Sequence, residues 1–258
     1  MVVGIDKGKI GMSKNWYAGW KAQVFQAAMS PLYFAFSLFF NRKIIVIVRP
    51  VKDHKKAPER DYYGDTHDYV RCRTMGLAAE EIRDNQIPGN VAEAGVFRGD
   101  FARRINIEFP DRKLFLYDTF EGFDSGQKKK EIEKQFTASS CTDSYNNFRD
   151  TNVDMVLNKM PFPDQCIIRK GLFPDSASVD DSEAFAFVSL DLDFSEPILS
   201  ALRFFYPRLS SGGYIFIHDY KNLDFKGVEA AVEIFEQEMG RLPKVPLPDS
   251  SGTLVITK

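Results

Sequence analysis

The stretch Gly89-Asn-Val-Ala-Glu-Ala-Gly-Val-Phe-Arg-Gly-Asp100 decides the fold that we predict for this chain. Residues 90–94 read as a short buried strand, and the glycines that follow mark a turn. Apolar residues at Phe101, Ile105 and Phe109 then predict an amphipathic helix. Such a strand, turn and helix leave unpaired backbone N–H groups that favour a polar or anionic ligand. A strand-to-helix turn without any ligand is the alternative.

An acid lies inside the end of this strand, at Glu93. The spacing Glu-x-Gly-x-x-x-Gly differs from the Gly-x-Gly-x-x-Gly of dinucleotide sites, which carry no acid at this point. An acid here suits a cationic cofactor. S-adenosylmethionine (SAM), with its ammonium and sulfonium groups, is one such cofactor.

The next strand supports this hypothesis. Within residues 112–118, positions 114–117 are apolar, and the strand ends in Asp118, 25 residues after Glu93. An acid at the end of the second strand of a strand–helix–strand unit can accept hydrogen bonds from the ribose hydroxyls of an adenosine. The alternative is that Asp118 caps a helix starting at residues 119–122.

Two later strands also end in polar residues. The most apolar strand, 184–190, is followed by Asp191 and Asp193, and the strand at 214–217 is followed by His218 and Asp219. Because parallel strands place their carboxyl ends along one crevice, we expect Asp191, His218 and Asp219 to meet there. They could hold a divalent cation, act as a general base with its orienting partner, or simply cap the following helices.

The remaining elements are predicted from periodicity and from turn residues. We expect a helix within 69–87, a long polar loop at 124–147 that could act as a lid, and a helix at 150–160. A third strand at 165–169 and a loop at 170–176 follow, then a helix from Glu196 that ends before Pro207, and a turn at 210–213.

Composition limits the function classes. The chain has 258 residues, of which 44% are hydrophobic and 27% charged, enough for one large α/β domain. A net charge of −2 gives no basic field, so we expect no nucleic-acid partner. Three widely spaced cysteines show no metal-type pairing and fit a reducing, cytoplasmic location.

The first 60 residues differ from the rest, and we predict two parts: an appendage at 1–60 and a catalytic-type domain at 61–258. Residues 31–40 are apolar and aromatic. Ten residues of helix rise about 15 Å, which is half of a bilayer core, so they do not span a membrane. We expect this segment to pack on the domain or on a second subunit of a homo-oligomer. An interfacial membrane anchor is the alternative.

Six ordered motifs together resemble the TylF/MycF/NovP group of macrocin-type O-methyltransferases, from about Tyr69 to Phe235. They are, in chain order, residues 91–99, Asp118-Thr-Phe-Glu-Gly122, Gly171-Leu-Phe-Pro-Asp175, Ser189-Leu-Asp-Leu-Asp193, 206–214 and His218-Asp-Tyr220.

The resemblance implies a Rossmann-like class I methyltransferase fold. This is an α/β fold with a mostly parallel seven-stranded sheet, helices on both faces and the last two strands antiparallel to each other. Residues 244–246 and 252–256 are placed to supply those two strands. A helical or strand appendage would precede this domain.

The resemblance also implies function and site residues. Members transfer a methyl group from SAM to a sugar hydroxyl, usually with magnesium. Carried across, Glu93, Gly95 and Gly99 shape the methionine and ribose pocket, Asp118 holds the ribose and Gly171 borders the adenine. Asp191, His218 and Asp219 match the metal-binding positions, with Asp191 and His218 as the catalytic pair.

This chain departs from the family pattern at His218, where the family has an acid. Magnesium prefers oxygen ligands, so the histidine leaves open a softer ion such as manganese, a metal-free site, or a general base. The expected partner is a small-molecule or glycan acceptor. A catechol or lipid O-methyltransferase and a non-catalytic scaffold of the same fold are the rival interpretations.

Overall fold

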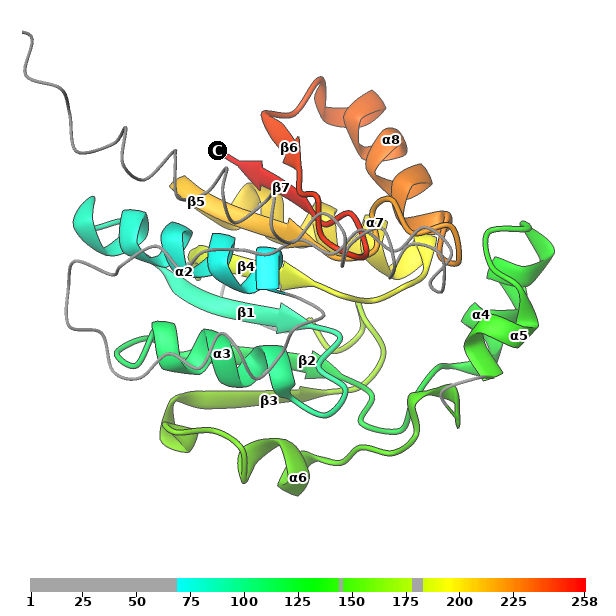
Figure 1. The fold of residues 1–258 in the computed structure, drawn as a ribbon, viewed down its shortest axis with the longest axis horizontal. Helices are drawn as coiled ribbons and strands as arrows, with labels where there is room; N and C mark the ends of the chain where they lie inside the picture. Colours follow the sequence, from blue (N-terminus) through cyan, green and yellow to red (C-terminus); the bar gives the residue numbers. More distant parts are fainter. Residues whose placement is uncertain (1–68, 144–145, 178–182) are drawn as a thin grey trace, which may run out of the picture. The chain divides into compact units, whose positions relative to one another are not determined.

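The computed structural model describes residues 69–143, 146–177 and 183–258. The predictions for residues 1–60, including the apolar segment 31–40, lie outside the described residues. Seven strands form one sheet in the order β3-β2-β1-β4-β5-β7-β6 (Figure 1). They are β1 (Asn90–Ala94), β2 (Leu114–Asp118), β3 (Cys166–Lys170), β4 (Phe185–Leu190), β5 (Leu209–Ile217), β6 (Lys244–Pro246) and β7 (Leu254–Thr257).

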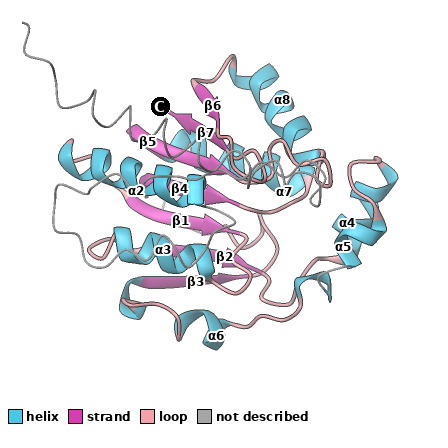
Figure 2. Cartoon of the chain, in the orientation of Figure 1, coloured by secondary structure: helices cyan, strands magenta, loops and turns pink. Residues whose placement is uncertain are grey.

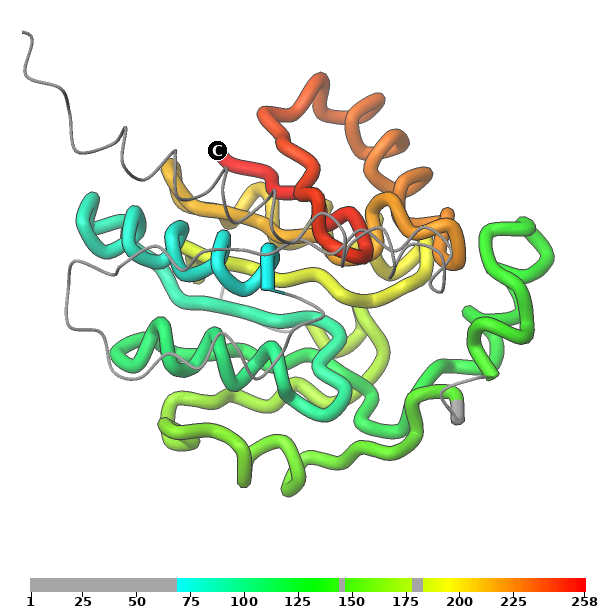
Figure 3. The backbone as a smooth tube through the Cα atoms, in the orientation of Figure 1, coloured from blue at the N-terminus to red at the C-terminus, as the bar shows by residue number. Residues whose placement is uncertain are grey.

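The sheet has the predicted mostly parallel arrangement. Strands β3, β2, β1, β4 and β5 are parallel neighbours, with Glu93 of β1 opposite Leu116 on one side and Ser189 on the other. Strand β7 pairs antiparallel with both β5 and β6. The chain therefore ends in the antiparallel edge expected from residues 244–256, and Figure 3 shows this segment beside β5.

Helices cover both faces of the sheet (Figure 2). Residues of α2 (Tyr69–Asp84), α3 (Asp100–Glu108) and α6 (Val153–Leu157) form one apolar cluster with strand residues such as Val91 and Phe187. Residues of α7 (Ser195–Arg208) and α8 (Gly227–Met239) form the cluster on the other face with Ala92 and Val188. This alternation along each strand is the period of two that buries a central strand on both sides.

Three segments differ from the sequence-based predictions. The polar stretch expected as a loop contains two helices, α4 (Ser125–Glu133) and α5 (Ser139–Asp143). Asp124 accepts a hydrogen bond from the Gln127 N–H and so caps α4, which compensates for its lack of an apolar face. Both helices lie beyond the carboxyl ends of the strands (Figure 1).

The other two differences concern the connection between α7 and β5. Helix α7 continues through Pro207 to Arg208, because a proline near the last turn disturbs few hydrogen bonds. The predicted turn at 210–213 belongs to β5, whose register against β4 shifts between Phe185 and Phe187. A bulge of this kind accommodates turn-type residues inside a strand.

Helix α8 was not predicted from the sequence, although Val228, Val232 and Phe235 repeat at helical spacing and are buried. Within the described part of the chain, no helix combines the length and apolar character needed to cross a bilayer.

Candidate active site

A cavity of about 440 Å³ lies at the carboxyl ends of the parallel strands. This is the edge at which open parallel sheets bind ligands. Seven of the eight predicted site residues line it: Glu93, Gly95, Asp118, Gly171, Asp191, His218 and Asp219. The eighth, Gly99, is not a lining residue. It precedes α3 in a left-handed conformation, and its role in cofactor binding stays a prediction.

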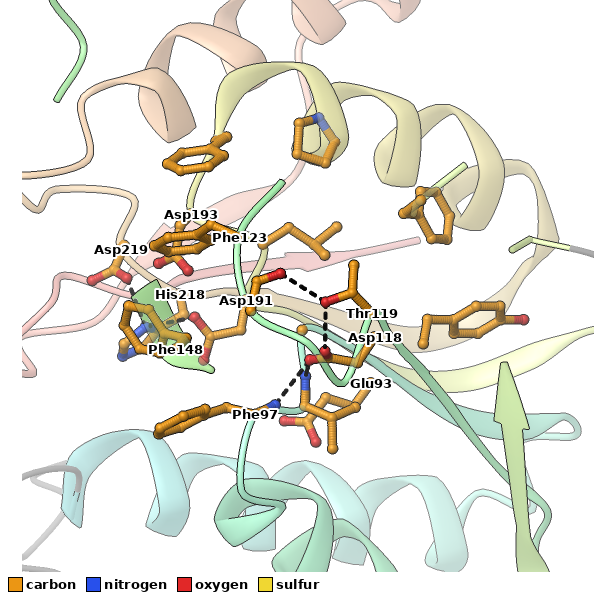
Figure 4. A pocket seen from close by; sticks show the side chains of 18 of the residues that line it. Glu93, Phe97, Asp118, Thr119, Phe123, Phe148, Asp191, Asp193, His218 and Asp219 are labelled. Atoms are coloured by element: carbon orange, nitrogen blue, oxygen red, sulfur yellow. Dashed lines mark hydrogen bonds and ion pairs between the residues drawn. The ribbon is translucent and has the colours of Figure 1, made fainter. Parts of the chain in front are cut away.

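The three polar residues expected at the ends of β4 and β5 do lie together (Figure 4). His218 Nδ1 is 3.0 Å from Asp191 Oδ1 and 3.1 Å from Asp219 Oδ2. Ligand atoms of these three side chains, here called the acid–histidine trio, all lie within 4.8 Å of one another. The topology explains this, since β4 and β5 are adjacent and parallel.

The two carboxylates of the trio determine the charge of His218. Burial alone would lower the pKa of the imidazole, but Asp191 and the hydrogen bonds to Asp191 and Asp219 raise it to about 10. Burial likewise would raise the pKa of Asp191, but His218 and Arg71 hold it well below its usual value. In the absence of a cation, His218 is therefore a proton-bearing imidazolium between two carboxylates.

A third acid adjoins the trio. Asp193 lines the cavity, and its φ of 61° is in the left-handed region. Burial, and then the charges of Asp219 and Asp191, raise the pKa of Asp193 well above its usual value. The sequence pattern does not distinguish Asp193 as a site residue, because an acid three residues after a strand end is also a common helix cap.

Glu93 is 1% exposed, and its Oε2 makes no hydrogen bond within the described structure. Burial raises the pKa of Glu93 well above its usual value, while the nearby Arg71 guanidinium lowers it in part. A buried polar atom without a partner is uncommon in native proteins, which makes this oxygen a candidate contact for a ligand. Because Glu93 lines the cavity, its free oxygen is available to a cationic ligand there.

Asp118 has a structural contact that the sequence did not indicate. Its Oδ2 accepts hydrogen bonds from the N–H groups of Val96 (2.6 Å) and Phe97 (2.9 Å), and its Oδ1 accepts one from Phe120 (2.6 Å). The carboxylate thus fixes the turn after β1. The Thr119 hydroxyl makes a fourth and longer contact, 3.5 Å to Oδ1. An ionised carboxylate has about four acceptor positions, so a ligand hydroxyl at Asp118 would replace the weak Thr119 contact.

The model of the macrocin-O-methyltransferase (TylF) family matches residues 11–247. The chain belongs to this family. The matched range includes the acid–histidine trio and all cavity-lining residues except Ser251.

Two curated relatives are O-methyltransferases. Mycinamicin III 3''-O-methyltransferase of Micromonospora griseorubida is 31% identical over 184 residues, covering 66% of this chain and 71% of the relative. Demethyldecarbamoylnovobiocin O-methyltransferase of Streptomyces niveus is 24% identical over 178 residues, covering 62% of this chain and 65% of the relative. The latter match thus spans just under two thirds of that relative's length.

Solved structures agree on the fold. The O-methyltransferase NovP superimposes with a TM-score of 0.60 at 19% identity, covering 75% of this chain and 83% of NovP. The calicheamicin methyltransferase CalS11 gives a TM-score of 0.60 at 17% identity, covering 75% of this chain and 80% of the other. At these identities the likeness supports the Rossmann-like methyltransferase fold of this family member.

Aromatic side chains form one wall of the cavity beside the trio, and Figure 4 shows Phe97, Phe123 and Phe148 there. The ring of Phe148 is 5.0 Å from that of Phe97 and 4.8 Å from that of Phe123. Phe123 in turn lies 4.6 Å from Phe194. The sequence pattern does not indicate this wall, because its rings come from segments that follow different strands.

The acid–histidine trio has the donor chemistry of a divalent-cation site. Two carboxylate oxygens and one imidazole nitrogen suit manganese and other ions that accept nitrogen, whereas magnesium prefers oxygen alone. The donors are close enough to share one ion. These residues therefore fit a divalent cation, provided that the imidazole gives up its proton.

Proposed function

We propose that this protein is a SAM-dependent O-methyltransferase that methylates a sugar hydroxyl on a glycosylated small-molecule acceptor, with a divalent cation at the acid–histidine trio. The main support is the cavity at the sheet edge, where Glu93, with its unpartnered carboxylate oxygen, and the trio line the same space. Family membership and the curated relatives, one named for a 3''-O-methyl transfer to mycinamicin III, support the reaction class.

We assign the cofactor to the side of the cavity formed by β1 and β2. Glu93 would accept a hydrogen bond from the cofactor ammonium, and Asp118 would accept one from the ribose. Gly95 and Gly171 also line the cavity. SAM supplies a methyl group that its sulfonium charge already activates, so the protein mainly has to align the acceptor oxygen.

The acceptor would occupy the other side, between the trio and the aromatic wall. Phe97, Phe123 and Phe148 offer apolar faces on which the C–H face of a sugar or an attached ring can pack. This wall excludes water from one side of the reacting hydroxyl.

The trio would promote removal of the proton from the acceptor hydroxyl. A cation held by Asp191, His218 and Asp219 would lower the pKa of a bound hydroxyl. In the cation-free site His218 carries a proton and cannot accept another, whereas a carboxylate can. The raised pKa of Asp193 means that its carboxylate binds a proton more readily than an ordinary aspartate does, so we add it to Asp191 and His218 as a candidate base.

Isothermal titration with SAM and with S-adenosylhomocysteine tests the cofactor assignment. We expect micromolar binding of both nucleotides and an additional metal-dependent heat when manganese and a simple diol are present. Absence of binding by both nucleotides would contradict the proposed function and favour a scaffold. Repetition in EDTA separates nucleotide binding from any contribution of the metal.

Replacement of Glu93 by glutamine is expected to stabilise the free protein while it weakens nucleotide binding. The pKa of Glu93 is raised in the folded state, so the folded protein retains a proton that the unfolded chain releases above a pKa of about 4.3. The retained proton lowers the free energy of unfolding progressively as the pH rises above that value. E93Q has no such proton and removes this loss of stability. Thermal unfolding at pH 5 and pH 8 should show a larger gain in Tm at pH 8.

The matched control for E93Q is Glu133→Gln in α4. The Glu133 side chain is 61% exposed, so the same substitution there acts on a solvated carboxylate. Its Tm should follow that of the wild type at both pH values. A lower Tm for E93Q at pH 8 would mean that Glu93 is charged and paired in the free protein.

A further inference from the structure

Arg71 of α2 is a buried cation directly behind the acid–histidine trio. The residue is 2% exposed, and its guanidinium lies 3.8 Å from the centre of the Phe101 ring. One terminal nitrogen donates to Ser189 Oγ at 2.9 Å, and the other donates to Asp191 Oδ2 at 3.2 Å. Contacts from α3 and β4 therefore hold this charge in one place.

These contacts divide the two oxygens of Asp191. Oδ2 faces Arg71, whereas Oδ1 faces His218 Nδ1 at 3.0 Å. Asp191 consequently presents one oxygen to any cation bound at the trio. An arginine stays charged at every accessible pH, so this arrangement does not depend on protonation.

Arg71 has two opposing effects on a divalent cation at the trio. By orienting Asp191 it lowers the entropy lost on binding, which is a small effect for one short side chain. Its positive charge repels a divalent cation that binds the same carboxylate. This repulsion is strong because solvent screens charges inside a protein only weakly. The repulsion is the larger effect.

We propose that Arg71 is a positioning residue. It holds one oxygen of Asp191, so that only the other oxygen is available to a cation at the trio, and it supplies a fixed positive charge beside that site. A divalent cation therefore binds this site weakly and exchangeably. The inference rests on the trio being the cation site of the proposed function. The Arg71 guanidinium then supplies part of the positive charge that a tightly bound metal ion would otherwise supply.

Manganese titration followed by electron paramagnetic resonance of the free ion tests the proposal on the full chain. The Arg71→Met variant is expected to bind Mn²⁺ at least about tenfold more tightly than the wild type, because one repelling charge is removed. Arg71→Lys, which keeps the charge, should remain close to the wild type. If R71M does not fold, Arg71→Gln carries the same expectation, since its amide can still donate to Asp191.

Arg83→Met is the matched control, since Arg83 lies on the same helix but twelve residues away, about 18 Å along its axis. R83M should bind Mn²⁺ as the wild type does. Equal or weaker binding by R71M, or no Mn²⁺ binding by any variant, would overturn the inference. Titration of S-adenosylhomocysteine into the same samples shows whether the methyltransferase proposal fails as well, because that binding does not need the metal.

Discussion

The Asp191→Asn variant is expected to lose methyl transfer on the order of 10³-fold in kcat/KM while it binds S-adenosylhomocysteine nearly as the wild type does. Asp191 is the member of the trio that contacts both His218 and Arg71. The amide keeps the shape of the side chain but removes the charge that would hold a cation and the imidazolium. The cofactor contacts assigned to Glu93 and Asp118 are left intact.

The measurement is initial rates of S-adenosylhomocysteine release with a glycoside that the wild type methylates, together with nucleotide affinity by titration. D191N also leaves Arg71 without its carboxylate partner. We expect a loss of about 1–3 kcal/mol in unfolding free energy, below the range for a fully buried pair because the Asp191 side chain is 25% exposed. Assays should therefore be run well below the Tm of the variant.

Asp164→Asn provides the control, because Asp164 is exposed in the short helical turn Pro163–Gln165, before β3. The same chemical change there should alter neither rate nor stability. Wild-type activity in D191N would contradict the catalytic role of Asp191 and favour Asp193 as the base. Equal losses of rate and nucleotide affinity would instead indicate a collapsed site.

The strand ends could be predicted from the sequence because they depend on local pattern and simple topology. Residues 90–94, 114–118 and 185–190 are short, mostly apolar segments followed by turn residues, and parallel strands bring their carboxyl ends together. These two features predict that Asp118, Asp191 and His218 lie along one crevice. The spacing of six ordered motifs identified the family.

Other site features depend on tertiary packing. Arg71 lies on a helix before the first strand of the sheet, and no periodicity indicates that it reaches the end of β4, 120 residues later. The aromatic wall brings Phe97 and Phe148 together from separate loops. The backbone contacts of Asp118 depend on the path of the turn after β1, which the sequence does not specify.

Helix α4 shows the limit of periodicity. Its residues are mostly polar, and it lacks the apolar stripe on which helix prediction depends. Its single buried residue, Glu131, accepts a hydrogen bond from the Ser195 N–H at 3.0 Å, at the start of α7. A polar anchor to another helix replaces the apolar face, and sequence pattern alone cannot reveal it.

The Gly95→Ala variant is expected to lose several kcal/mol of unfolding free energy, which is a large part of the roughly 5–15 kcal/mol typical of a domain. Gly95 has a φ of +85°, and an added Cβ would lie 1.8 Å from the Asp191 carbonyl oxygen and 2.5 Å from its carbonyl carbon. The obstacle is backbone at the end of β4, so no side-chain rotation relieves it. Any shift that makes room also moves Asp191.

Gly240→Ala is the matched control because it has the strain of a positive φ without a clash of the added Cβ. Gly240 has a φ of +86° but nothing within 4 Å of an added Cβ, at the exposed end of α8. Its φ and ψ lie in a region adopted almost only by glycine, at a cost of about 1–3 kcal/mol for other residues. Denaturant unfolding should show a larger loss for G95A than for G240A. Equal losses would mean that conformation alone requires glycine at position 95, and that the close contact between the turn and the Asp191 backbone is not what fixes this part of the site.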